Sequence, residues 1–160
     1  MKFAIIGAGM AGLACAEALA QAGHGVALFD KGRGPGGRMS TRRMATPLGE
    51  IAFDHGAQYF TARDPAFIRL VSGWSEAGLA APWPLAGADA WIGMPTMNSV
   101  IRTMAAPHPV KWGSLVSSMA RKAGHWWLRD TGGELGPFDA VVLAVPAEQG
   151  AAILSLPRFP

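Results

Sequence analysis

The stretch Phe3-Ala4-Ile5-Ile6-Gly7-Ala8-Gly9-Met10-Ala11-Gly12 decides the fold that we expect for this chain. Its first four residues are uniformly apolar, which is typical of a parallel strand buried on both faces. The glycines follow at the spacing G-x-G-x-x-G. Gly7 permits a tight turn, Gly9 lets backbone approach a pyrophosphate, and Gly12 lets a helix pack closely on the strand. We expect the pyrophosphate at the amino end of that helix, which begins near Met10 and Ala11.

The residues that follow complete a strand-helix-strand unit. Apolar side chains recur at helical spacing, at Leu13, Ala16, Leu19 and Ala20. Gly23 ends the helix, and Val26-Ala27-Leu28-Phe29 forms a second buried strand. Asp30 closes that strand, where a carboxylate accepts hydrogen bonds from the hydroxyls of a ribose. An acid at this position disfavours a 2'-phosphate, so the sequence predicts an unphosphorylated adenosine.

Composition limits the classes of protein that fit. The chain has 160 residues, of which 50% are hydrophobic and 16% charged, as expected of a globular domain. Its formal charge is +3, and the basic residues Lys31, Arg33, Arg38, Arg42 and Arg43 follow Asp30. Because no nucleic-acid-binding motif accompanies them, we expect them to neutralise a cofactor pyrophosphate rather than to bind nucleic acid.

Several other features exclude alternatives. Cys15 is the only cysteine, which rules out an internal disulfide and favours a reducing compartment. The four histidines lie far apart, without metal-ligand spacing, so no metal site is expected. No apolar run is long enough to span a bilayer, and the start of the chain does not resemble a cleaved signal. We therefore expect a cytoplasmic protein without a membrane partner.

A glycine-rich basic loop and a second motif come next. The loop is Lys31-Gly32-Arg33-Gly34-Pro35-Gly36-Gly37-Arg38, and by itself it is equally compatible with a flexible surface loop. The second motif is Phe53-Asp54-His55-Gly56-Ala57-Gln58-Tyr59-Phe60-Thr61, a strand-like run with hydrogen-bonding side chains. His55 could act as a general base, but an isolated histidine is more often a packing or capping residue.

Together these motifs resemble the amine-oxidase-like flavoproteins with an NAD(P)-binding Rossmann-like domain, and among them the bacterial renalase-like oxidoreductases. The resemblance covers nearly the whole chain. It implies FAD as the cofactor, bound by Met10, Asp30, Lys31, Gly37, Arg38, Ala57 and Gln58, with residues 58–63 passing the flavin ring and Val116 on the adenine side.

The segment 62–109 differs in character. Asp64-Pro65 predicts the start of a helix, 78–90 is expected to be a loop, and 98–106 a helix capped by Asn98 or Ser99. The resemblance makes this segment part of a substrate-binding cap. It implies that a small-molecule substrate is bordered by Tyr59, Phe60, Thr61, Trp91 and Met94, with Met97. The alternative is that the tryptophan and methionines only fill the core of the cap.

The last third returns to strands. Residues 110–112, 115–119 and 125–129 predict a β-meander, 140–145 a parallel strand and 146–154 a helix. Related flavoproteins continue beyond the equivalent of Pro160, so the fold is predicted to be incomplete at its C-terminus, with exposed strand edges that favour self-association.

The sequence thus predicts an α/β Rossmann-like FAD-binding fold, a parallel sheet plus a β-meander, with an inserted partial cap. The FAD-binding domain would comprise 1–61 and 110–160, and the cap 62–109. The resemblance implies oxidation of a reduced nicotinamide-type or amine substrate by hydride transfer to flavin, with dioxygen reoxidising the flavin to give hydrogen peroxide. No catalytic residue is assigned. The alternatives are a truncated, non-catalytic adenosine- or FAD-binding module and, less favoured, an NAD-dependent reductase.

Overall fold

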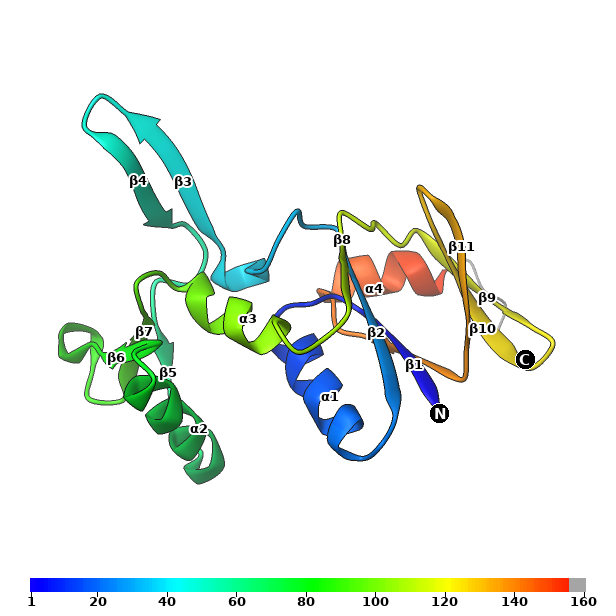
Figure 1. The fold of residues 1–160 in the computed structure, drawn as a ribbon, viewed down its shortest axis with the longest axis horizontal. Helices are drawn as coiled ribbons and strands as arrows, with labels where there is room; N and C mark the ends of the chain where they lie inside the picture. The colour runs from blue at the N-terminus through cyan, green and yellow to red at the C-terminus, as the bar shows by residue number, and fades with distance from the viewer. Residues whose placement is uncertain (156–160) are drawn as a thin grey trace. The chain divides into compact units, whose positions relative to one another are not determined.

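A computed structural model describes residues 1–155, which form two compact units (Figure 1). The first unit comprises Met1–Gly34 and the chain from Met104 onward, and the second comprises Pro35–Thr103. The predicted FAD-binding range 110–160 includes residues 156–160, which lie outside the described residues. The division by role, 1–61 with 110–160 against 62–109, stays a prediction.

The first unit contains a four-stranded parallel sheet in the order β12-β1-β2-β8. Its strands are β1 (Lys2–Ile6), β2 (Gly25–Asp30), β8 (Val110–Trp112) and β12 (Ala140–Leu143). Helix α1 (Met10–Gln21) connects β1 to β2, which lie side by side with Ile5 opposite Leu28. This arrangement confirms the predicted α/β fold with a parallel sheet.

The central strands β1 and β2 are buried on both faces of the sheet. Successive side chains of a strand point to opposite faces, so each strand contributes to two cores. Ile5 and Leu28 are fully buried, as are Leu13 and Ala16 of α1. Leu19 is half-buried and Ala20 exposed, so the buried stripe of α1 is narrower than the sequence predicted. The opposite face of the sheet contributes Ala4, Ile6 and Phe29 to a core with the meander, and Ile153 of α4 (Ala147–Leu154) joins this core.

The predicted meander is present, with different bounds. Its strands are β9 (Ser118–Lys122), β10 (His125–Asp130) and β11 (Gly133–Phe138), paired antiparallel in the order β11-β10-β9. Residues 110–112, predicted to belong to the meander, instead form a strand of the parallel sheet beside β2. Residues 115–117 are irregular rather than strand. The meander therefore starts later, and an irregular segment connects it to the sheet.

The second unit is built from a hairpin, a small antiparallel sheet and helices. Its elements are the 3-10 helix η1 (Gly37–Met39), β3 (Thr41–Thr46), β4 (Gly49–Asp54), β5 (Phe60–Thr61), α2 (Pro65–Glu76), β6 (Ala80–Pro82), η2 (Pro84–Ala86), β7 (Ala90–Gly93) and α3 (Asn98–Ala105). Strands β3 and β4 pair with each other, and the second sheet has the order β5-β7-β6. Figure 1 shows the β3–β4 hairpin as a long two-stranded arm of this unit.

Some of this unit was predicted and some was not. The Asp64 carboxylate accepts hydrogen bonds from the N–H groups of Ala66 and Phe67, which confirms the predicted start of α2. The β3–β4 hairpin was not predicted, and it leaves Met44, Leu48, Ile51 and Phe53 exposed. The strand-like run at 53–61 contains only the two strand residues of β5 after β4 ends, and 78–90 holds β6 and η2 rather than loop alone.

Among the described residues, no helix combines the length and the apolarity needed to cross a membrane.

Candidate functional site

The turn between β1 and α1 uses its three glycines in different ways. Gly7 has a φ of 103°, and a Cβ there would lie 2.5 Å from the carbonyl oxygen of Ala144. A Cβ at Gly12 would lie 1.9 Å from the carbonyl oxygen of Gly7, so only glycine lets α1 start this close to the turn. A Cβ at Gly9 would meet nothing within 4 Å. Gly9 is therefore the position where a ligand can approach the backbone.

The amino end of α1 has backbone N–H groups that no side chain caps. Its N-cap is Gly9, no side chain caps it, and no acidic residue lies in its first turn. The N–H groups of Met10, Ala11 and Gly12 have no acceptor within the helix, and the helix dipole adds positive charge at this end. Met10 is half-buried and Ala11 exposed. This end of α1 fits a phosphate or pyrophosphate group.

The Asp30 carboxylate is fixed to the glycine turn by backbone hydrogen bonds. Its Oδ2 accepts from the N–H of Ala8 at 2.7 Å, and its Oδ1 accepts from the N–H of Gly32 at 2.7 Å. A carboxylate oxygen can accept two hydrogen bonds, so each oxygen retains capacity for a further donor. Asp30 is half-buried. The carboxylate is thus held in a fixed orientation and can still accept from a ribose hydroxyl pair, which fits the adenosine half of a dinucleotide.

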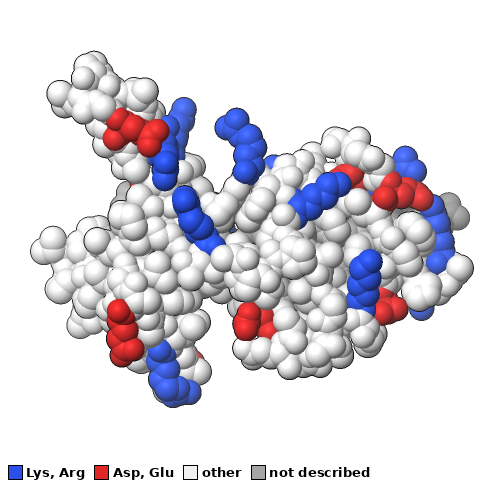
Figure 2. Space-filling view, in the orientation of Figure 1, with Lys and Arg blue, Asp and Glu red and all other residues white. Residues whose placement is uncertain are grey.

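The basic residues that follow Asp30 in sequence are divided between the two units. Lys31 and Arg33 belong to the first unit, whereas Arg38, Arg42 and Arg43 belong to the second. Arg43 Nη1 lies 3.4 Å from Glu50 Oε1 across the hairpin, so Arg43 is paired there. On the face that Figure 2 shows, basic and acidic side chains are spread among uncharged residues. The expectation that these basic residues neutralise a cofactor pyrophosphate stays a prediction.

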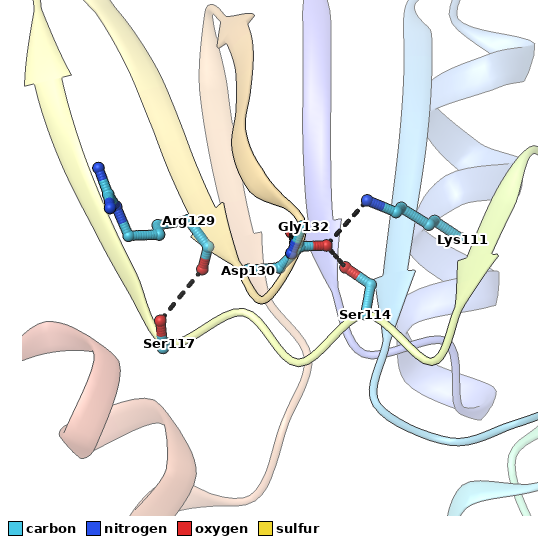
Figure 3. A network of polar contacts seen from close by, with 6 residues as sticks. All are labelled: Lys111, Ser114, Ser117, Arg129, Asp130 and Gly132. Carbon is cyan, nitrogen blue, oxygen red and sulfur yellow. Dashed lines mark hydrogen bonds and ion pairs between the residues drawn. The ribbon is translucent and has the colours of Figure 1, made fainter.

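A buried polar network holds the segment that follows β8 (Figure 3). Ser114 Oγ donates to Asp130 Oδ2 at 2.6 Å, and Lys111 Nζ donates to the same oxygen at 2.8 Å. The N–H of Gly132 donates to Asp130 Oδ1 at 2.8 Å. These partners, the Lys111 hydrogen bond first, lower the pKa of Asp130 from 3.8 to about 2. Asp130 is therefore a charged, hydrogen-bonded carboxylate at neutral pH.

Val116 lies on this segment, and its side chain points into the core. The residue is 4% exposed and packs with Met119, Leu128 and Phe138. Because the side chain is buried in this core, a contact with adenine would have to use the Val116 backbone. The predicted adenine contact of Val116 stays a prediction.

The second unit brings the two flavoprotein-like motifs together. The N–H of Ala57 donates to the carbonyl oxygen of Arg38 at 2.7 Å. A Cβ at Gly56 would lie 2.2 Å from that oxygen, which explains why glycine precedes Ala57. Gly37 begins η1, and the Arg38 and Gln58 side chains are exposed. The structure thus joins the loop at 36–38 to the motif at 55–58, while the contacts of Gly37, Arg38, Ala57 and Gln58 with FAD stay predictions.

The residues predicted to border a substrate lie on or beside the small sheet. Phe60 of β5 pairs with Trp91 of β7, and its ring lies 6.0 Å from that of Phe67 and 6.3 Å from that of Trp74. Thr61 is exposed, and Tyr59 is 44% exposed with its ring edge-on to Trp83. Met94 is 38% exposed, but Met97 is fully buried. Met97 therefore fills the core, as the alternative interpretation had it, and Tyr59, Thr61 and Met94 present accessible surface.

The sequence did not reveal two carboxylates that organise the structure. Asp130 binds Lys111 and Ser114, which lie 19 and 16 residues earlier. Asp54 accepts hydrogen bonds from the Thr41 hydroxyl at 2.5 Å and from the N–H of Met97, at the start of α3, at 3.1 Å. The only local signal was at Asp130, where an aspartate two residues before a glycine is typical of an Asx turn. Among the described residues, no group of three or more His, Cys, Asp or Glu side chains is arranged to hold a metal ion.

Comparison with known proteins agrees with the fold. Residues 5–74 match the NAD(P)-binding Rossmann-like domain family. A 40-residue stretch is 52% identical to 4,4'-diapophytoene desaturase (4,4'-diaponeurosporene-forming) of Staphylococcus aureus strain Newman, and it covers 25% of this chain and 8% of the desaturase. The match begins in the first unit, agrees with its Rossmann-like fold and suggests a nucleotide cofactor.

Solved structures share the fold at low sequence identity. One is a protein from Exiguobacterium sp. 255-15 provisionally described as a protoporphyrinogen oxidase, with a TM-score of 0.74, 11% identity and coverage of 97% of this chain. Another is a CLA-producing fatty acid isomerase from P. acnes, with a TM-score of 0.69, 15% identity and coverage of 99% of this chain. This chain spans 61% of the length of each of these two proteins.

Proposed function

We propose that this chain carries the nucleotide-binding part of an FAD-dependent oxidoreductase with renalase-like chemistry. One observation carries the proposal. The Asp30 carboxylate is oriented by the N–H of Ala8, directly beside a helix end that no protein group caps. A carboxylate for the ribose and free N–H groups for the pyrophosphate are the two elements that an ADP moiety requires.

Different residues of the first unit would bind the different parts of the ADP moiety. Gly7 and Gly12 shape the turn, and Gly9 keeps it accessible. The N–H groups at the start of α1 would bind the pyrophosphate oxygens, and Asp30 would accept the ribose hydroxyls. Lys31 is exposed next to Asp30 and would add positive charge near the phosphates.

The rest of the proposal follows the resemblance to renalase-like proteins. Arg38, with its exposed guanidinium, and Ala57 and Gln58 would contact the flavin half, and Tyr59, Phe60, Thr61, Trp91 and Met94 would border a small-molecule substrate. When bound, an FAD would supply two-electron redox chemistry, by which the hydride of a reduced nicotinamide-type or amine substrate and a proton from solvent would convert dioxygen to hydrogen peroxide. The side chains named here bind and orient; none is assigned an acid or base role.

The test is cofactor binding by the full chain. We expect FAD to give a bound visible flavin spectrum and to raise the melting temperature, because a ligand that binds only the folded state stabilises it. NAD should stabilise less than FAD. Absence of both a flavin spectrum and a thermal shift would remove the proposal, and tighter binding of NAD would favour a nicotinamide-dependent reductase instead.

A second candidate is a module that binds adenine nucleotides without turnover. It is favoured because the glycine turn and the Asp30 hydrogen bonds, on which the proposed site rests, would both bind the ADP half of the cofactor. Such a module should be stabilised by ADP as strongly as by FAD. It should also produce no peroxide from NADH when loaded with FAD, whereas measured peroxide production favours the oxidoreductase.

A further inference from the structure

The segment 113–117 is anchored at both of its ends. At its start, the N–H of Gly113 donates to the carbonyl oxygen of Gly32 at 2.8 Å, and the N–H of Ser114 donates to the carbonyl oxygen of Asp30 at 2.8 Å. At its end, the N–H of Ser117 donates to the carbonyl oxygen of Arg129 at 2.9 Å. The segment is thus bound to the end of β2, which carries Asp30, and to β10 of the meander.

Asp130 connects these two anchors through side chains. It lies at the end of β10, one residue after Arg129, and binds both Ser114 and Lys111 (Figure 3). Lys111 belongs to β8, which pairs with β2 so that Trp112 lies opposite Asp30. Asp130 of the meander thus binds one residue within β8, Lys111, and one residue just after β8 ends, Ser114.

The network is buried on the side of Asp130 and Ser114, whereas the Lys111 side chain is 49% exposed. Among residues 1–155, Ser114 and Asp130 are the buried polar or charged residues, at 3% and 7% exposure. A buried charge pair often contributes no more stability than a well-packed apolar pair of the same volume, whereas the loss of one partner leaves a buried charge uncompensated. Such networks are best suited to holding one geometry, because every partner must be present in its place.

We propose that Asp130 is a positioning residue for an adenine nucleotide. It holds segment 113–117 against the end of β2 and thereby fixes the main chain beside the Asp30 carboxylate, where the adenosine would bind. This inference rests on the proposed nucleotide site. Asp130 itself would contact neither the ribose nor the pyrophosphate and would act through Ser114 and Lys111.

The test compares two probes on the full chain by calorimetric titration. ADP would engage both the adenosine and the pyrophosphate positions, and inorganic pyrophosphate only the helix end. Asp130→Asn removes the charge that binds Lys111 and weakens the acceptor for Ser114. Glu134→Gln is the matched control, since Glu134 lies on the same meander and pairs with Lys122 and Arg129 away from segment 113–117.

We expect Asp130→Asn to weaken ADP binding about tenfold, the size of one charged hydrogen bond, and to change pyrophosphate binding by less than about twofold. Glu134→Gln should change neither. Lys111→Arg, which keeps a cationic donor, should retain most of the ADP affinity that Lys111→Met loses. Lys111→Met should keep its affinity for pyrophosphate within about twofold, which loss of folding alone would not give.

Two results separate this inference from the proposed function. A wild-type chain that binds neither ADP nor FAD would overturn both. If the wild-type chain binds ADP, two results for a folded Asp130→Asn variant would overturn only the positioning role. One is unchanged ADP affinity, and the other is an equal proportional loss of ADP and pyrophosphate affinity. If Asp130→Asn does not fold, Ser114→Ala is measured by the same comparison, because it removes the hydroxyl and leaves the Lys111–Asp130 pair intact.

Discussion

The N–H of Ala8 donates a 2.7 Å hydrogen bond to Asp30 Oδ2, which joins the glycine turn to the end of β2. In Asp30→Asn, the side chain has one carbonyl oxygen for two backbone donors, so either Ala8 or Gly32 loses its acceptor. We expect the free energy of unfolding to fall by about 1–2 kcal/mol, measured by urea denaturation. ADP affinity should fall about tenfold, because the ribose loses a charged acceptor.

Asp139→Asn is the control for this variant. Asp139 Oδ2 accepts from the N–H of Lys2 at 2.7 Å, at the other end of β1 from the glycine turn. Its replacement tests the same carboxylate-to-backbone contact away from the nucleotide. Equal losses of ADP affinity in the two variants would contradict a ribose-binding role for Asp30.

Replacement of the second or the third glycine of the motif should affect different properties of the protein. Gly12→Ala places a methyl group 1.9 Å from the Gly7 carbonyl oxygen, so backbone must move, and we expect a loss of about 1–3 kcal/mol in the free energy of unfolding. Gly9→Ala meets open space at a φ of −81°, so its stability should change by less than about 0.5 kcal/mol. Gly9→Ala should nevertheless weaken ADP binding, because its methyl group occupies the approach of the pyrophosphate. A Gly9→Ala protein with unchanged ADP affinity would place the phosphate elsewhere.

The lowered pKa of Asp130 predicts a defined pH dependence. The pKa is 3.8 in its ordinary state and about 2 in the folded protein, so the folded state binds this proton less readily than the unfolded state. Stability from this group is therefore fully present above about pH 5 and is lost as the pH falls toward 2. The difference in free energy of unfolding between wild type and Asp130→Asn should be constant from pH 7 to 5 and should shrink below pH 4. A difference that stays constant down to pH 2 would show that the charge of Asp130 does not contribute.

The parts of the fold that sequence predicts well are those set by neighbouring residues. The β1-α1-β2 unit follows from an apolar run, glycines at fixed spacing and a second apolar run that ends at Asp30. The start of α2 follows from Asp64 and Pro65, since an aspartate cap and a proline at the first helical position act within one turn. Each of these signals needs no knowledge of the rest of the chain.

The parts that sequence missed depend on distant contacts. The β3–β4 hairpin leaves most of its apolar side chains exposed, so it lacks the contrast between buried and exposed faces that reveals a strand. Val110–Trp112 was assigned to the meander because a three-residue strand looks alike in either sheet, and its partner, β2, lies about eighty residues earlier. The partners of Asp54 and Asp130 likewise become neighbours only in the folded chain.

Asp54 illustrates this last class, because it accepts a hydrogen bond from the N–H of Met97, 43 residues later and directly before α3. The sequence predicted Asn98 or Ser99 as the cap of α3. In the structure the Asp54 carboxylate instead accepts from the N–H of Met97, and Thr41 Oγ accepts from the N–H of Asn98 at 3.3 Å. The Ser99 hydroxyl accepts a long hydrogen bond from the N–H of Thr96, before the helix. The base of the hairpin thus supplies the helix end with both its acceptors and its negative charge.

We therefore expect Asp54→Ala to reduce the free energy of unfolding by about 1 kcal/mol, the usual cost of a lost N-cap. Thr41→Val keeps the shape of the side chain but removes the hydroxyl that donates to Asp54 and accepts from the N–H of Asn98, so it should also cost about 1 kcal/mol. Glu50→Ala is the control, because Glu50 lies in the same hairpin and pairs only with the exposed Arg43 among the described residues. Denaturant unfolding followed by tryptophan fluorescence measures all three. If Asp54→Ala and Glu50→Ala were equally stable, the hairpin would not be acting as the cap of α3, and the start of this helix would depend on packing of Met97, Val100 and Ile101 alone.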